Sequence, residues 1–185
     1  DLGEAKKKGK IGKLFVMGCL SERFLKDLEN ELPEVDRFYG KFNWKELLND
    51  LGKSYHRELA ADRVLTTPRH YAYLKIAEGC DRTCSYCAIP ISTGRYQSIP
   101  MEEIEKEVRL LVKQGVKEFQ VIAQDLTYYG LDLYKRHALP ELVERISDIP
   151  GVEWIRLHYG YPSHFPYDLL RVMSERDNVC KYMDI

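Results

Sequence analysis

The sequence predicts an α/β protein: a partial parallel (β/α) barrel over residues 67–185, preceded by part of a smaller α/β domain over residues 1–66. Strand-like apolar runs alternate with amphipathic helix patterns after Tyr71, as expected for parallel strands joined by right-handed crossovers. Between the two parts, residues 53–69 show no periodic pattern, and Thr66-Thr67-Pro68 is typical of a linker. A chain of 185 residues can hold two small domains with cores of their own.

The first part has the pattern of a Rossmann-like domain. A short apolar run ends at a tight turn, Gly18-Cys19, and a helical pattern with Phe24, Leu25 and Leu28 on one face follows it. The lysine-rich opening is typical of a solvated helix end. In order, the expected elements are a strand at 13–17, a helix at 21–28, a strand at 35–39 and a helix at 44–51.

The second part alternates more regularly. Pro100 is expected at a first helical position, and Ile104, Val108 and Leu111 line one face of the helix that follows, until Gly115. The expected elements are a strand at 71–77, this helix, a strand at 119–123, a helix at 140–147, a strand at 152–157, a helix at 166–174 and a strand from Tyr182 onward. This amounts to roughly four βα steps of a barrel.

Composition and charge weigh against several classes of protein. The formal charge of −1 lacks the basic excess of a domain that grips nucleic acid, and no apolar stretch is long enough for a membrane span. Five cysteines, three of them in one tight loop, argue against a disulfide framework and favour a reducing cytoplasm. The chain starts without methionine and stops in what looks like a strand, so we expect a fragment of a longer protein.

The cysteine loop carries the strongest chemical signal. Cys80, Cys84 and Cys87 are spaced C-x-x-x-C-x-x-C directly after the strand expected at 71–77. Three thiolates on one loop can bind three irons of a 4Fe-4S cluster, and the fourth iron then stays open to an amine and a carboxylate of a small molecule. The alternative is a zinc site, which needs four ligands, but His70 and Cys180 match no common zinc spacing.

Two segments resemble one enzyme family. The loop EGCDRTCSYCAIP, at 78–90, is similar to that of radical S-adenosylmethionine methylthiotransferases, and QDLTYYG, at 124–130, resembles the branch that acts on a ribosomal protein. The resemblance implies a barrel of the radical-SAM type and transfer of a methylthio group to the β-carbon of an aspartate in a small-subunit ribosomal protein. It also implies S-adenosylmethionine, two 4Fe-4S clusters in the whole enzyme and an electron donor.

Two other functions stay open. A tRNA adenosine methylthiotransferase shares the cluster loop, so the three cysteines cannot tell it apart; the near-neutral charge and QDLTYYG favour the protein substrate. A zinc-stabilised interaction module without catalysis is the alternative from another class.

Cys19 is a candidate ligand of the second cluster. The segment VMGCLSERF resembles the part of the methylthiotransferase amino-terminal domain that carries the last of three cysteines. The two earlier ones have no counterpart here, so we do not expect this chain alone to complete the reaction. Without the resemblance, a lone cysteine is more often a small buried apolar residue.

The remaining site residues are expected where barrel enzymes hold their chemistry, after the carboxyl ends of the strands. Gln124 and Asp125 are candidates for binding S-adenosylmethionine, unless they only cap a turn. Tyr86 would pack beside the adenine, or simply fill the loop. Arg156 needs an anion, either the methionine carboxylate or a neighbouring acid. Ser163 is a candidate for binding S-adenosylmethionine, unless it belongs to a simple turn.

Overall fold

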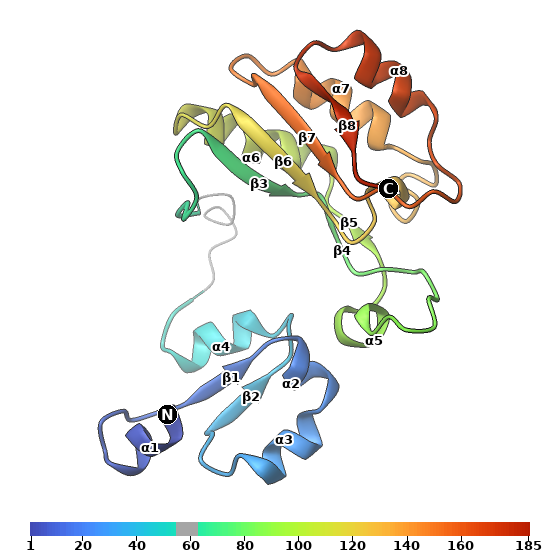
Figure 1. The fold of residues 1–185 in the computed structure, drawn as a ribbon. Helices are drawn as coiled ribbons and strands as arrows, with labels where there is room; N and C mark the ends of the chain where they lie inside the picture. The colour runs from blue at the N-terminus through green and yellow to red at the C-terminus, as the bar shows by residue number, and fades with distance from the viewer. Residues whose placement is uncertain (55–62) are drawn as a thin grey trace. The chain divides into compact units, whose positions relative to one another are not determined.

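The computed structural model describes residues 1–54 and 63–185 (Figure 1). The chain divides into two compact units: Asp1–Arg57 with Arg82–Gly94, and Glu58–Asp81 with Arg95–Ile185. Residues 55–62, inside the stretch predicted to lack a regular pattern, lie outside the described residues. The boundary placed between residues 66 and 67 stays a prediction.

The first unit contains a two-stranded parallel sheet with short helices. Strand β1 pairs with β2 in parallel, with Phe15 opposite Arg37 and Met17 opposite Tyr39. The helix predicted over 21–28 is wrong in one respect, because it breaks at Phe24, whose φ of −122° and ψ of 30° are not helical. In order, the elements are α1 (Leu2–Lys7), β1 (Phe15–Met17), α2 (Cys19–Arg23), α3 (Leu25–Glu31), β2 (Arg37–Tyr39), α4 (Trp44–Asp50) and, from further along the chain, α5 (Ile89–Thr93).

The second unit is built on a four-stranded parallel sheet in the order β3-β6-β7-β8. The strands are β3 (Tyr71–Lys75), β6 (Glu118–Ile122), β7 (Trp154–His158) and β8 (Val179–Met183), and the crossovers run through α6 (Met101–Lys113), α7 (Leu139–Ser147) and α8 (Asp168–Glu175). Figure 1 shows the three helices on one face of the sheet. The predicted α/β class with a parallel sheet is confirmed.

The core lies between that face of the sheet and the helices. Alternate strand residues are fully buried there, among them Leu74, Phe119 and Ile155. The stripe predicted on α6 packs against them, with Ile104, Val108 and Leu111 at 0% exposure. On the opposite face, side chains of the same strands stay accessible: Tyr73 is 47% exposed and Trp154 48%. Strand periodicity of two therefore separates a packed face from an open one.

Two local differences from prediction in the second unit have physical causes. The strand expected over 71–77 is interrupted at Ile76, whose N–H donates to Ile122 while its carbonyl accepts from Ile99. Beyond it, β4 (Ala77–Glu78) pairs antiparallel with β5 (Gln97–Ser98). The last strand starts at Val179, not Tyr182 as predicted, because the Asn178 side chain donates to Ser147 and Val152 and its carbonyl accepts from Ile155. That anchoring lets pairing begin three residues earlier.

Candidate cofactor site at the carboxyl ends of the strands

The register of the parallel sheet decides which loops meet. Lys75 lies opposite Ile122, and Ile122 opposite His158, so β3, β6 and β7 end at the same edge. The segments after these strands start with Ile76, Ala123 and Tyr159. Every candidate for S-adenosylmethionine binding except Tyr86 and Arg156 comes from the second and third of these segments. This edge, formed by the carboxyl ends of the parallel strands, is where the active site of a barrel enzyme is expected.

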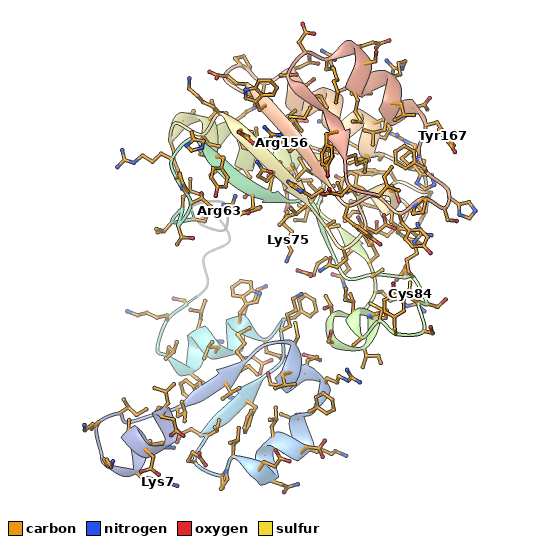
Figure 2. All side chains as sticks on the ribbon, in the orientation of Figure 1. Lys7, Arg63, Lys75, Cys84, Arg156 and Tyr167 are labelled. Atoms are coloured by element: carbon orange, nitrogen blue, oxygen red, sulfur yellow. The ribbon has the colours of Figure 1, made fainter. Side chains whose placement is uncertain are left out.

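The three loop cysteines form no disulfide and differ in exposure. Cys80 is buried, whereas Cys84 and Cys87 are partly exposed. Cys80 follows β4 in the second unit, and Cys84 and Cys87 belong to the first, where the Cys87 N–H donates to the Cys84 carbonyl at 3.1 Å. Figure 2 shows Cys84 on the loop before α5. Across residues 1–54 and 63–185, no three His, Cys, Asp or Glu side chains are gathered as a metal-binding group.

Gln124 joins the segment after β6 to the residue just before the cysteine loop. Its Nε2 donates to Glu78 Oε1 at 2.7 Å, and Glu78 also forms an ion pair with Lys75. A carboxylate only accepts, so this bond fixes which end of the amide faces Glu78. The other end, Gln124 Oε1, is buried and has no hydrogen-bond partner within the described part of the chain. A buried acceptor without a donor is costly, which makes this atom a candidate contact for a ligand donor.

Asp125 has a different environment. Its side chain is buried and its Oδ1 accepts from Thr127 N at 2.9 Å, Thr127 Oγ1 at 2.6 Å and Tyr161 N at 3.4 Å. It caps the short 3-10 helix at Leu126–Tyr128 and joins the segment after β6 to the one after β7. The carboxylate thus performs the turn-capping role weighed from the sequence, and its cofactor contact stays a prediction.

Arg156 lies on the open face of the sheet (Figure 2). Its Nε donates to Glu118 Oε1 at 2.5 Å, and this hydrogen bond is the main reason why the pKa of the guanidinium is raised. The neighbouring acid considered from the sequence is therefore present. The side chain remains 45% exposed, so it keeps N–H groups for a second anion.

A hydrogen-bonded row continues from Glu118 across the open face. Gln120 Nε2 donates to Glu118, Gln120 Oε1 contacts His158 Nε2, and His158 Nδ1 lies 3.3 Å from Asp184 Oδ2. The pKa of Asp184 is lowered, first by the hydrogen bond from the Tyr182 hydroxyl and then by His158. Polar groups from β6, β7 and the end of β8 are thus held in one row.

Tyr86, Ser163 and Cys19 are all exposed. Tyr86 is 92% exposed between two of the loop cysteines, so the structure does not place it as a filler of the loop. Ser163 Oγ contacts His164 Nδ1 at 2.9 Å, and His164 has a φ of 59°. Cys19 opens α2, which contacts α5 within the first unit.

Sequence reasoning missed two residues at this edge. Glu78 directly precedes Gly79-Cys80, and an acid beside the loop was a usable signal. The second residue, Tyr96, gave no signal in the sequence. Its side chain is 3% exposed. Its N–H donates to Asp81 Oδ1 at 3.0 Å, and its hydroxyl donates to the Asp125 carbonyl at 2.8 Å. Burial raises the pKa of the Tyr96 phenol far above its usual range, so it stays a neutral donor.

Comparisons with known proteins point in the same direction as this geometry. Residues 74–184 match the model of the radical SAM superfamily. The chain is 85% identical over 185 residues to the ribosomal protein uS12 methylthiotransferase RimO of Parabacteroides distasonis, and 74% identical to that of Bacteroides thetaiotaomicron. It spans 43% and 42% of the length of these relatives.

A solved structure of the radical S-adenosylmethionine methyltransferase TsrM from Kitasatospora setae, with tryptophan and a SAM analogue, covers 63% of this chain and 24% of its own. The TM-score is 0.48 at 16% identity. Among the helices that the structure describes, none has the length and apolar character needed to cross a bilayer.

Proposed function

We propose, on the premise that this chain belongs to the radical SAM superfamily, that it is the part of a ribosomal protein methylthiotransferase that binds a 4Fe-4S cluster and S-adenosylmethionine. The observation that carries the proposal is the C-x-x-x-C-x-x-C loop that follows β3, the first strand of the parallel sheet, and the short β4, in a chain 85% identical to a RimO protein. The proposed setting is the bacterial cytoplasm, where ribosomes are found.

The donor set fits a 4Fe-4S cluster. Three cysteine thiols that form no disulfide lie within eight residues of one loop, and soft thiolate ligands suit iron–sulfur clusters. Three thiolates would leave one iron without a protein ligand, and the amine and carboxylate of S-adenosylmethionine would bind there. When bound, the cluster supplies a single electron for reductive cleavage of S-adenosylmethionine. An electron donor is therefore a necessary partner.

Gln124 and Glu78 fit the ammonium group of S-adenosylmethionine. Gln124 Oε1 is the buried acceptor without a donor, and the carboxylate that fixes its orientation adds negative charge beside it. An ammonium group provides three donors and a positive charge, so it satisfies both. Lys75, already ion-paired with Glu78, holds that carboxylate in place.

Arg156 and Tyr86 complete the proposed site. The guanidinium keeps donors for the methionine carboxylate beside its bond to Glu118. The Tyr86 ring, exposed between two cluster ligands, offers a stacking surface to adenine. Ser163 is proposed to contact the adenosine from the segment after β7. Cys19 is proposed as one ligand of the second cluster.

The proposed substrate is ribosomal protein uS12, the protein that the names of the relatives give. The net charge of −1 supports a protein substrate over tRNA. The test is a chimaera in which these 185 residues replace the matching segment of the full-length Parabacteroides distasonis protein. The chimaera is expressed in cells that lack their own enzyme. Mass spectrometry of uS12 should show one methylthio group on one aspartate. Methylthiolated tRNA with unmodified uS12 would contradict the proposal.

A further inference from the structure

Two segments of the second unit are joined by side chains that the proposed chemistry does not use. One is residues 123–138, which contains the sequence QDLTYYG, and the other is residues 95–101, between α5 and α6. The Tyr129 hydroxyl donates to the Ile99 carbonyl at 2.7 Å, and Met101 N donates to the Tyr134 hydroxyl at 2.9 Å. Asp132 accepts from Ser98 N and Ser98 Oγ.

Tyr96 differs from these other tyrosines because it extends the connection to the cysteine loop. Its hydroxyl donates to the Asp125 carbonyl, and its own N–H donates to the Asp81 carboxylate, one residue after Cys80. Its ring packs against Tyr128 with centroids 5.1 Å apart. The ring and hydroxyl are buried, so the bond to the Asp125 carbonyl is shielded from competition by water, whereas the bond to the exposed Asp81 is only part-buried.

The connection continues on the other side. The Asp125 carboxylate accepts from Tyr161 N, and Leu126 N donates to the Tyr159 carbonyl at 3.1 Å. Tyr159 has a φ of 67°, a conformation that a bulky residue adopts only when its surroundings hold it. A continuous series of bonds therefore runs from Asp81 through Tyr96 and Asp125 to the segment after β7.

We propose that Tyr96 is a positioning residue, which holds the first cluster cysteine, Cys80, in a fixed relation to the segments after β6 and β7. It acts through Asp81 on one side and Asp125 on the other, and touches no reacting atom itself. The motif QDLTYYG then has a mechanical role, since it supplies both the carbonyl that anchors Tyr96 and the tyrosine rings around it. The value of this positioning for catalysis rests on the proposed function.

The test uses the cluster-free chain, so it does not depend on cluster chemistry. The reagent is iodoacetamide, and peptide mass spectrometry gives the alkylation rate of Cys80 relative to Cys84 and Cys87. Loss of one buried hydrogen bond eases local opening by roughly tenfold. The variant Tyr96→Phe keeps the ring and removes the hydroxyl bond to the Asp125 carbonyl. Alkylation of Cys80 relative to Cys84 and Cys87 should therefore rise about tenfold.

Tyr134→Phe is the matched control, because it also removes a hydroxyl bond between residues 123–138 and 95–101 but has no link to Asp81. It should leave the Cys80 ratio unchanged. A second pair of variants tests the hydrogen bond between the Tyr96 N–H and Asp81. Asp81→Ala should raise the alkylation ratio of Cys80, whereas Asp81→Asn keeps the Oδ1 acceptor and should return the ratio to that of the unmutated chain. An unchanged ratio in Tyr96→Phe and Asp81→Ala, or an equal rise in Tyr134→Phe, would overturn the proposal.

Cys180, buried on β8, reports whether a variant has unfolded as a whole. If its alkylation rises in Tyr96→Phe, the Asp81 pair decides the outcome. A second readout is the rate at which a chelator removes iron from the reconstituted chain, which should be about tenfold faster in Tyr96→Phe than in Tyr134→Phe. A chain that takes up no iron but shows the alkylation pattern would refute the proposed function and leave the positioning role standing.

Discussion

Gln124 Nε2 donates to Glu78 Oε1 at 2.7 Å, and this bond ties the segment after the second barrel strand to the residue that precedes the cysteine loop. It leaves Gln124 Oε1 buried and without a donor in the part of the chain that the structure describes. The same bond thus connects the two segments and orients one acceptor.

Gln124→Ala should weaken binding of S-adenosylmethionine to the cluster-loaded chain. A hydrogen bond to a charged group contributes about 1.5–3 kcal/mol, so we expect the dissociation constant to rise roughly 10- to 100-fold. Isothermal titration calorimetry under anaerobic conditions measures it. The control is Gln97→Ala, an exposed glutamine on β5. Equal affinity in both variants would remove Gln124 from the proposed site.

Arg156→Ala should raise the same dissociation constant by about tenfold, because the guanidinium is proposed to bind the methionine carboxylate. Arg171→Ala is the matched control, since Arg171 also pairs with acids, Glu144 and Glu175, but on the helical side of the unit. If Arg156→Ala binds S-adenosylmethionine as tightly as Arg171→Ala, then the role of Arg156 is limited to its hydrogen bond with Glu118. The neighbouring acid would then be its sole anion.

Gly130→Ala tests the fold of the QDLTYYG segment. Gly130 has a φ of 90°, and a Cβ there would come 2.4 Å from the Ala138 Cβ. We expect a loss of about 2–4 kcal/mol in the free energy of unfolding, from backbone strain plus overpacking. Gly115→Ala, with a φ of 97° and no atom within 4 Å of the added Cβ, isolates the strain alone. It should cost about 1–2 kcal/mol.

Urea unfolding followed by circular dichroism gives both values. A loss in Gly130→Ala no larger than that in Gly115→Ala would mean that Ala138 moves aside freely. The segment would then be too loose for the positioning role argued for Tyr96.

Local patterns predicted the elements well where burial is one-sided. Strand-like runs that alternate with amphipathic helix patterns predicted the parallel sheet, and the stripe on α6 and the alternation in β6 and β7 agree with it because these elements bury one face against one core. The break at Phe24 and the start of β8 were missed. They depend on a single backbone conformation and on the Asn178 side chain reaching across 26 and 31 residues of sequence.

In the candidate site, too, features set by local sequence could be predicted and features set by long-range contacts could not. The cysteine loop is readable because its ligands are local in sequence, whereas Tyr96 acts through bonds to residues 15 and 29 positions away. Arg156 was expected to need an anion, but no pattern could select Glu118, 38 residues earlier, as its partner. That pairing follows from the register of β6 and β7, which only the folded sheet fixes.

The central claim is that Cys80, Cys84 and Cys87 bind a 4Fe-4S cluster with one open iron. Its most direct measurement is metal and sulfide analysis of the chain after anaerobic reconstitution, with an absorption spectrum of the same sample. We expect iron and acid-labile sulfide in equal amounts and a brown chromophore in the chain and in Cys180→Ala, and neither in Cys84→Ala. A colourless chain that holds one tightly bound zinc ion would contradict the account.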